Sequence, residues 1–464
     1  MVIISLNSIK YFILFFLFII GNAFLQQVLL DKHLGNQTLE IVKISNGYEL
    51  FTVGKPVRIS ISIDTDVEDF SVLEIGRKMN NNDVATDCVA LGRIINYLLT
   101  ISSLISLILL DHSNIKVHWY GASTLYEFSS AFDERYWLNS LGVSIYIEYD
   151  VPLFVDGDQQ LNNHICFTAK AAFPYSSDNK FNFKYKIGFS SNARKTHINA
   201  MNHFFEIPKS YPDENLIKHL IWSTHGIFGR SLTQDQIHNF MNEAITKLGI
   251  HSSMLIIDDG WESCYGSLAV DETKFPNMKN LITIIKTQFI GMKVELYVRP
   301  IIESSCKDNF NFAKNNNYLV KSATGSVFMD TVLKPDLTKE TTHIDFSNPD
   351  ATKWFKSRLE KLKAETGADG FKFAWGSQIH LPSNTKPQFN KSFSPNILTS
   401  NFVKMAAELG SSSVVRAGWK TQDQNLLSGI AINYSKFDGM PLILMIPTWI
   451  QMNMIGYPFI LTGN

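Results

Sequence analysis

The sequence has little charge, and positive and negative residues are evenly mixed. Only 18% of the 464 residues are charged, the net charge is −1, and no basic or acidic run stands out. Proteins that bind nucleic acid place clustered Lys and Arg against the phosphates. We therefore expect no nucleic acid partner.

Motifs for metals and redox cofactors are also lacking. The four cysteines contain no C-x-x-C pair, and the 12 histidines contain no H-E-x-x-H pattern. Because zinc sites use these spacings, we expect no metal ion, and no other pattern indicates a cofactor. Cys88, Cys166, Cys264 and Cys306 are far apart, so in an oxidising compartment two disulfides are possible, in any of three pairings.

The N-terminal segment has the layout of a secretory signal peptide. Lys10 precedes the apolar block Tyr11–Ile20, and Gly21-Asn22-Ala23 places small residues at positions −3 and −1 of a cleavage after Ala23. This predicts a signal peptide over residues 1–23 and a mature chain that is secreted or lies in the endomembrane lumen. An uncleaved signal anchor is the alternative, because Phe24-Leu25 continue the apolar run.

Two further features bear on the same compartment. Asn36, Asn390 and Asn433 lie in N-x-S/T sequons, which are glycosylated in the secretory pathway. Ile94–Leu110 is almost continuously apolar, so it is a buried helix, a short membrane span or an insertion foreign to the fold. We favour the buried helix, because Asn96 and several hydroxyl groups interrupt the stretch.

Residues 24–205 show the two-residue alternation of half-buried β-strands. It is clearest in Val143–Tyr149 and Phe181–Ile187, and turn signals such as Asn46-Gly47 separate the runs. Many strands joined by short turns favour an N-terminal β-sandwich.

After Leu220 the apolar spacing becomes that of helices alternating with buried strands. Thr233-x-x-Gln236 is a capping box, followed by apolar residues at helical spacing up to Leu248, and then by the buried strand Met254–Asp259. This alternation predicts a (β/α)₈ TIM barrel over residues 206–464, with a doubly wound sheet as the alternative. The other predicted elements are strands over Val294–Val298, Gly370–Phe373, Ser412–Arg416 and Tyr457–Leu461, and helices that begin near Met278, Pro349 and Pro395.

Polar and aromatic side chains gather where the predicted strands end, which is where barrels place their reactive groups. Ionic groups pair with sugar hydroxyls, and indole rings stack on the C–H faces of sugars. Taken singly, an Asp-Asp-Gly is often only a turn and a Trp is often core, but their joint placement at successive strand ends favours a sugar-binding cleft. The candidate substrate-binding residues are Trp222, Asp258, Asp259, Lys372, Arg416 and Trp419.

Several short segments also occur in a characteristic order along the chain. They are Ile221-Trp-Ser-Thr224, Ile257-Asp-Asp259, Lys274-Phe-Pro276, Phe371-Lys-Phe373 and Gly456–Ile460, with His118–Gly121 and Pro152–Val155 in the β-rich half. With these segments the chain resembles glycoside hydrolase family 31, in the branch that contains the myogenesis-regulating glycosidase. The resemblance implies a retaining glycosidase acting on α-linked sugars, α-galactosides in this branch, with a carbohydrate as its ligand.

At the catalytic positions the chain departs from the family it resembles. Retaining enzymes use two carboxyl groups about 5–5.5 Å apart, one as nucleophile and one as acid/base. The resemblance places the nucleophile two residues after the strand's lysine, where this chain has Ala374, and Ser377 stands where the branch often has a glutamate. The family's spacing places the acid/base at Asn433. Asp438 is the alternative if one insertion is allowed, and Asp423 is a remote one.

The C-terminal half also predicts fewer strands than the eight of a closed barrel. Members of the family continue through an eighth strand and a further β domain. We therefore expect an incomplete barrel, truncated at its C-terminus, with an unpaired strand edge.

These departures lead to three functional hypotheses. A methyl group cannot act as a nucleophile and an amide cannot donate a proton as a general acid, so we expect a glycoside hydrolase family 31-like protein with impaired hydrolysis of O-glycosyl bonds. Three hypotheses remain for what such a chain does: an active α-glycosidase that uses other carboxylates, a non-catalytic sugar-binding or interaction protein, and an incomplete gene product with no stable function. The sequence determines neither the sugar and its linkage nor the oligomeric state.

Overall fold

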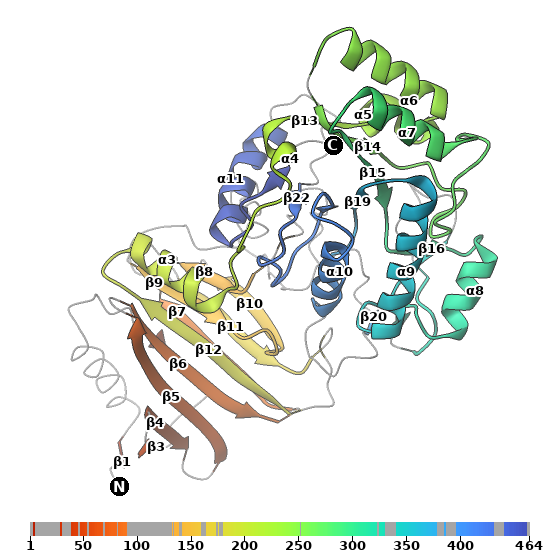
Figure 1. The fold of residues 1–464 in the computed structure, drawn as a ribbon. Helices are drawn as coiled ribbons and strands as arrows, with labels where there is room; N and C mark the ends of the chain where they lie inside the picture. The colour runs from red at the N-terminus through yellow and green to blue at the C-terminus, as the bar shows by residue number, and fades with distance from the viewer. Residues whose placement is uncertain are drawn as a thin grey trace. The chain divides into compact units, whose positions relative to one another are not determined.

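The computed structural model divides into two compact units (Figure 1). We call residues 1–129, 134–205 and 392–394 the N-terminal unit, and residues 130–133, 206–391 and 395–464 the barrel unit. The residues that the structure describes are 3–4, 28–29, 39–44, 47–52, 55–67, 70–80, 82–90, 132, 134–138, 142–158, 164–172, 175, 180–250, 252–322, 324–329, 340–377, 385–386, 396–430 and 440–461.

Antiparallel strands build the N-terminal unit. Eight of them form one sheet in the order β1-β3-β4-β5-β6-β12-β9-β8, and four form a second sheet in the order β10-β11-β7-β2. Their bounds are β1 (Ile3–Ile4), β2 (Val28–Leu29), β3 (Leu39–Ile44), β4 (Gly47–Thr52), β5 (Lys55–Val67), β6 (Phe70–Met79), β7 (Val84–Ala90), β8 (Tyr136–Leu138), β9 (Val143–Ile147), β10 (Leu153–Asp158), β11 (His164–Lys170) and β12 (Phe181–Phe189).

The two sheets bury their alternate side chains against each other. Phe183 of β12, in the larger sheet, shares one buried cluster with Phe167 of β11, in the smaller sheet. The other face of the larger sheet is covered by α3 (Ala193–Phe204), whose Ala200 and Met201 pack in a separate cluster with Tyr146 of β9. Two antiparallel sheets around a shared core confirm the predicted β-sandwich.

The structure bears on the cysteine pairing that the sequence left open. Cys264 and Cys306, both in the barrel unit, form a disulfide. Cys88 of β7 and Cys166 of β11 are register partners on neighbouring antiparallel strands. Each half of the chain therefore contains its own pair of cysteines.

Seven parallel strands form the sheet of the barrel unit, in the order β13-β14-β15-β19-β21-β22-β23. Parallel neighbours need crossover connections, which helices supply between most of these strands, although β21 and β22 are joined by the loop 416–426 alone. The strands are β13 (Leu220–Ser223), β14 (Ser252–Ile257), β15 (Lys293–Val298), β19 (Gly370–Phe373), β21 (Val414–Val415), β22 (Leu427–Gly429) and β23 (Ile460–Leu461), and the longer helices are α6 (Gln234–Phe240), α7 (Met278–Gln288), α8 (Lys307–Asn315), α9 (Pro349–Thr366), α10 (Ile397–Ala407) and α11 (Met440–Met454). The shorter elements are α4 (Glu214–Lys218), α5 (His225–Phe228), η3 (Gly229–Ser231), β16 (Ile301–Glu303), β17 (Lys321–Ser322), β18 (Thr341–His343) and β20 (Thr385–Lys386).

This sheet curls, and its two faces carry different side chains. Leu255 and Ile257 of β14 join the large cluster that includes the helices, whereas Met254 and Ile256 pack on the other face. On that inner face, Met254 and Ile256 share one cluster with Val414 of β21 and Leu427 of β22. In a flat sheet β21 and β22 would lie well over 10 Å from β14, so the sheet must curl to bring these side chains together. The predicted incomplete (β/α)₈ barrel is therefore confirmed, and the alternative of a doubly wound sheet is not supported.

Helix ends in the barrel unit follow the local sequence signals, with one exception. Both hydrogen bonds of the capping box form between Thr233 and Gln236, and Gly367 ends α9 in the left-handed conformation, with φ 79°. After α6 the chain continues as a π-helical segment, η4 (Met241–Thr246). The π geometry rotates the following residues off the buried face, so that Leu248, predicted as part of the apolar stripe, is exposed.

Within the described ranges, every helix is too short or too polar to cross a lipid bilayer. The apolar stretch 94–110 lies outside the described residues, as do the sequon residues Asn36, Asn390 and Asn433.

Candidate active site

The candidate site residues lie at the ends of four strands of the sheet. Asp258 and Asp259 directly follow β14, Arg299 follows β15, Ala374 follows β19 and Arg416 follows β21. Because neighbouring parallel strands end at the same edge of a sheet, these residues lie side by side at the mouth of the curled sheet.

Asp258 is buried and paired with Lys372. Its Oδ2 accepts hydrogen bonds from the Lys372 ammonium at 2.7 Å and from the Ser223 hydroxyl at 2.9 Å. Burial alone would raise the pKa of Asp258, but the charge and hydrogen bond of Lys372 outweigh it and lower the pKa below its ordinary value. Burial lowers the pKa of Lys372, and the nearby Arg416 acts in the same direction. The carboxylate is therefore held ionised by a buried ion pair.

Asp259 accepts hydrogen bonds from three side chains that sequence reasoning missed. Arg230 Nε lies 2.8 Å and Arg299 Nη2 lies 2.7 Å from its Oδ2, and the Tyr265 hydroxyl donates to its Oδ1 at 2.6 Å. Arg299 was within reach of the sequence, since it stands directly after a predicted buried strand, as Asp258 does. Arg230 and Tyr265 lie in loops, where no spacing signals the contact.

Aromatic rings fix the Arg299 guanidinium. Its carbon lies 4.5 Å from the ring centroid of Trp375, 5.0 Å from that of Tyr265 and 5.3 Å from that of Tyr297. Arg299 is 6% exposed, and its buried Nη1 makes no hydrogen bond with any residue in the described ranges. Trp375 adopts a φ of 63°, a strained value for a bulky residue, and turns the chain immediately after Ala374.

The loop that carries Tyr265 is braced from several directions. The Cys264–Cys306 disulfide ties it to the start of α8, and the Tyr265 carbonyl accepts the backbone N–H of Glu303 at 2.9 Å. The partly buried Glu262 carboxylate accepts hydrogen bonds from the backbone N–H groups of Gly266 and Leu268, and desolvation raises the pKa of Glu262 to about 7. These contacts hold the Tyr265 hydroxyl against Asp259.

At the nucleophile position there is no ionisable group. Ala374 is buried, and its backbone N–H donates to the Val298 carbonyl at 3.0 Å, continuing the ladder between β15 and β19. Ser377, three residues on, is also buried. Asn433 and Asp438, the two positions considered for the acid/base, lie outside the described residues, and the Asp423 carboxylate accepts a hydrogen bond from the neighbouring Gln424 at 2.8 Å.

The two candidate tryptophans lie in other surroundings. Trp222 faces the outer helices: its ring is 5.5 Å from that of Phe240, and its Nε1 donates to the Ser252 hydroxyl at 2.6 Å. Trp419 is 2% exposed. The structure thus brings Asp258, Asp259 and Lys372 together beside Arg416, but it does not bring Trp222 to them.

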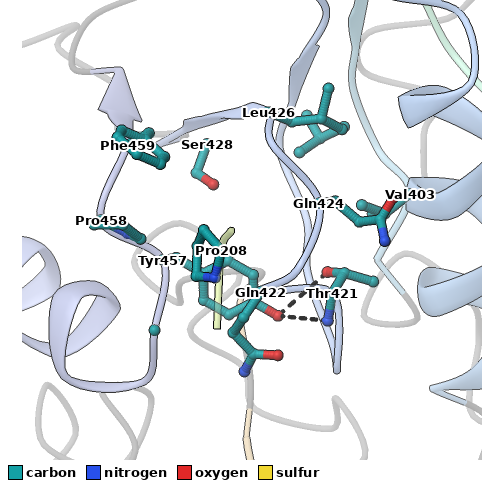
Figure 2. A pocket seen from close by; sticks show the side chains of 12 residues that line it. Pro208, Val403, Thr421, Gln422, Gln424, Leu426, Ser428, Tyr457, Pro458 and Phe459 are labelled. Carbon is teal, nitrogen blue, oxygen red and sulfur yellow. Dashed lines mark hydrogen bonds between the residues drawn. The ribbon is translucent and has the colours of Figure 1, made fainter. Parts of the chain in front are cut away.

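A pocket lies away from the cluster of ionic groups, between the loop 416–426, β22 and the start of β23 (Figure 2). The Tyr457 hydroxyl lies 3.3 Å from both the backbone nitrogen and the hydroxyl of Thr421 there. None of the lining side chains carries a carboxylate, an imidazole or a cationic group. The lining residues are Pro208, Val403, Val415, Thr421, Gln422, Gln424, Leu426, Ser428, Gly456, Tyr457, Pro458 and Phe459.

Sequence comparisons place the barrel segment among known glycosidases. Residues 222–427 match the family model for the glycosyl hydrolases family 31 TIM-barrel domain. The chain is 26% identical over 355 residues to the myogenesis-regulating glycosidase of Mus musculus, a match that covers 74% of this chain and 48% of that protein. It is also 26% identical over 163 residues to the alpha-xylosidase XylQ of Lactiplantibacillus pentosus, covering 33% of this chain and 20% of that one. The chain therefore spans at most about half the length of these relatives.

Solved structures share the fold at lower identity. A GH31 dextranase from Flavobacterium johnsoniae, complexed with glucose, matches with a TM-score of 0.64 at 15% identity, over 92% of this chain and 53% of that one. A GH31 alpha-xylosidase from a soil metagenome, complexed with xylose, matches with a TM-score of 0.62 at 14% identity, over 91% of this chain and 72% of that one.

Proposed function

The chain is a glycoside hydrolase family 31-like protein with the family's TIM-barrel domain over residues 222–427, and on that premise we propose that its strand-end site binds α-linked glycosides but hydrolyses them poorly. One observation carries the proposal: the carboxylates of Asp258 and Asp259 are hydrogen-bonded to cationic side chains, while residue 374, at the end of β19 two strands away, is an alanine.

The binding half of the proposal rests on the chemistry of these groups. Carboxylates accept hydrogen bonds from sugar hydroxyls, and arginine and lysine donate to hydroxyl oxygens; such charge-assisted bonds are the stronger ones. Asp258 and Lys372 offer both functions within 2.7 Å of each other. The dextranase and alpha-xylosidase with the same fold carry glucose and xylose in their crystals, which supports a sugar as the ligand class.

The impairment rests on the missing nucleophile. A retaining mechanism needs a carboxylate that attacks the anomeric carbon, and the methyl group of Ala374 cannot form that bond. Loss of a covalent nucleophile costs on the order of 10⁶-fold in turnover in a well-characterised protease. Binding of the sugar needs no nucleophile, so the chain can bind a glycoside without hydrolysing it.

The test compares binding with turnover on the folded full chain. We expect calorimetry to detect binding of methyl α-D-galactoside to the chain. We expect an aryl α-galactoside with a good leaving group to be hydrolysed no faster than in a blank without protein. Ala374→Asp should raise hydrolysis of that substrate, because its leaving group needs no acid. Unaided turnover of about 1–10³ per second would mean that another residue is the nucleophile. Absence of sugar binding would refute the proposal.

We also propose that the chain enters the secretory pathway. The apolar block Tyr11–Ile20 and the cleavage pattern at Ala23 support it, and the Cys264–Cys306 disulfide fits an oxidising compartment. After alkaline carbonate extraction of expressing cells, the protein should be in the soluble fraction. Quantitative retention in the membrane pellet would argue instead for an uncleaved anchor or for a span at 94–110.

A further inference from the structure

We propose that the strand ends around Ala374 bind a carboxylate of the ligand, so that the site prefers an acidic sugar to its neutral counterpart. The inference rests on the proposed glycoside binding and adds the charge of the preferred ligand. It follows from the neighbours of Ala374, from the balance of charge around it and from one unpartnered donor.

Ala374 lies between two arginines on adjacent strands. Val298 is the register partner of Phe373 across β15 and β19, and Phe373 is that of Val415 across β19 and β21. The ladders continue by one residue, because Ala374 N–H donates to the Val298 carbonyl and Arg416 N–H to the Phe373 carbonyl, both at 3.0 Å. Arg299 and Arg416 therefore flank Ala374.

All three side chains leave the same face of the sheet. Side chains alternate along a strand, and the outward residues Val298, Phe373 and Val415 belong to the cluster packed on the helices. Their successors, Arg299, Ala374 and Arg416, consequently turn to the inner face. A carboxylate at position 374 would have a guanidinium on each side. With alanine at this position, Arg299 and Arg416 have no carboxylate between them.

Among the described residues, the inner-face cations Lys372, Arg299 and Arg416 pair with only two carboxylates, Asp258 and Asp259. Asp258 is paired with Lys372, while the single carboxylate of Asp259 serves both Arg230 and Arg299. The guanidinium of Arg416 makes no hydrogen bond or ion pair with any residue that the structure describes. Its positive charge also acts on buried Lys372, which places the two cations near each other. An anionic ligand group would relieve this repulsion.

Arg299 supplies the donor for that group. It is more than nine-tenths buried and held by the rings of Trp375 and Tyr265, and no described residue accepts a hydrogen bond from its Nη1. A buried unpaired donor costs free energy that a bound acceptor recovers. Because the guanidinium is already fixed, it needs little reordering when the acceptor binds. Carboxylate fits best, since its two oxygens match the guanidinium fork.

Burial sets both the strength and the route of this contact. Ala374 is fully buried and Lys372 is 5% exposed, so a carboxylate that reaches them sits in a medium where charges interact strongly. Arg416 is partly exposed. A neutral sugar carries no charge that this medium would strengthen, so it gains less than a carboxylate.

The experiment compares two ligands that differ only in charge, titrated into the full chain by calorimetry. Methyl α-D-galacturonide should bind about 10- to 100-fold more tightly than methyl α-D-galactoside, the gain of one or two charge-assisted hydrogen bonds. Sodium acetate should compete with the galacturonide, but only at far higher concentration. The preference should shrink as salt is added, since Arg416 is open to solvent.

Three variants locate the preference. Ala374→Asp fills the place with the protein's own carboxylate, so the preference should vanish or reverse. Arg416→Gln, at a partly exposed position where folding is not at stake, should reduce it by about tenfold. Lys361→Gln removes one cation from the exposed surface of α9 and should leave it unchanged. Circular dichroism on each variant confirms that it is folded.

The possible failures point to different conclusions. Equal affinity for both sugars would overturn the carboxylate site while leaving glycoside binding intact. Acetate binding as tightly as the galacturonide would show a site for free anions and overturn the assignment to a sugar. If neither sugar binds, the proposed function itself falls.

Discussion

The two sides of the strand-end site differ in how their charges are matched. On the side of β14 and β15, Asp259 accepts hydrogen bonds from Arg230, Arg299 and Tyr265. On the side of β19 and β21, Ala374 offers no charge, and Arg416 is unpaired among the described residues. At the ends of β14 and β15 the Asp259 carboxylate is fully engaged in hydrogen bonds. At the ends of β19 and β21 the hydrogen-bond donors of Arg416 have no acceptor among the described residues.

The difference shows which functional residues the fold itself maintains. Without its carboxylate, Asp259 would leave Arg299 buried beside no counter-charge, so the network is needed for stability as well as for any ligand. A carboxylate at position 374 has no such role, because the strand there is held by backbone hydrogen bonds that an alanine makes equally well. The Asp259 carboxylate therefore has a structural role in the fold, whereas a carboxylate at position 374 would not.

Substitution of Asp259 should give the largest effect. Asp259→Ala strands a buried guanidinium, and we expect the free energy of unfolding to fall by about 3–5 kcal/mol in urea titrations followed by tryptophan fluorescence. The matched change on the other side, Ala374→Gly, should cost no more than about 1 kcal/mol. Similar costs for the two variants would erase the contrast between the sides.

Loss of the disulfide beside Tyr265 should come next. Cys264→Ser with Cys306→Ser should lower the free energy of unfolding by about 2–4 kcal/mol and weaken binding of methyl α-D-galactoside, because Tyr265 is no longer held against Asp259. Cys88→Ser with Cys166→Ser, in the other unit, is the control and should leave the sugar affinity unchanged. An affinity that falls equally in both double variants would place the effect outside the Tyr265 loop.

A smaller effect should follow pH through Glu262. Burial raises the pKa of this carboxyl from 4.5 to about 7, so the folded chain keeps a proton that the unfolded chain releases. Its contribution to stability is therefore full below about pH 4.5 and is lost as the pH rises through about 7, with a slope near 1 kcal/mol per pH unit. Comparing urea unfolding of the wild type and Glu262→Gln at several pH values isolates this slope. If Glu262→Gln shows the same pH dependence of the free energy of unfolding as the wild type, that dependence comes from another group.

The smallest expected effect belongs to Trp222. Trp222→Phe keeps the contact with Phe240 but removes the hydrogen bond to Ser252, which should cost about 1 kcal/mol of stability. Because the ring lies on the outer face of β13, sugar affinity measured by calorimetry should not change. A fall in affinity of tenfold or more would bring Trp222 back to the site.

Much of the barrel unit was predictable because its signals are local. The capping box at Thr233, the glycine at Gly367 and the apolar period of β14 each depend on neighbours within a few residues. The exposure of Leu248 was not predictable, since the π-helical turn that causes it leaves no clear pattern in the sequence. The short strand β22 was missed because no helix precedes it.

The sequence by itself determined the fold class, most of the strands and the identity of residue 374, because these depend on residue types and their spacing. Only the tertiary structure decided the partners of each charge. Arg230 and Arg299 are far from Asp259 along the chain, and they meet it because β13 and β15, which precede them, are the two neighbours of β14 in the sheet. Hydrogen bonds between side chains act over about 3 Å, so which groups pair is set by distances that the folded chain alone defines.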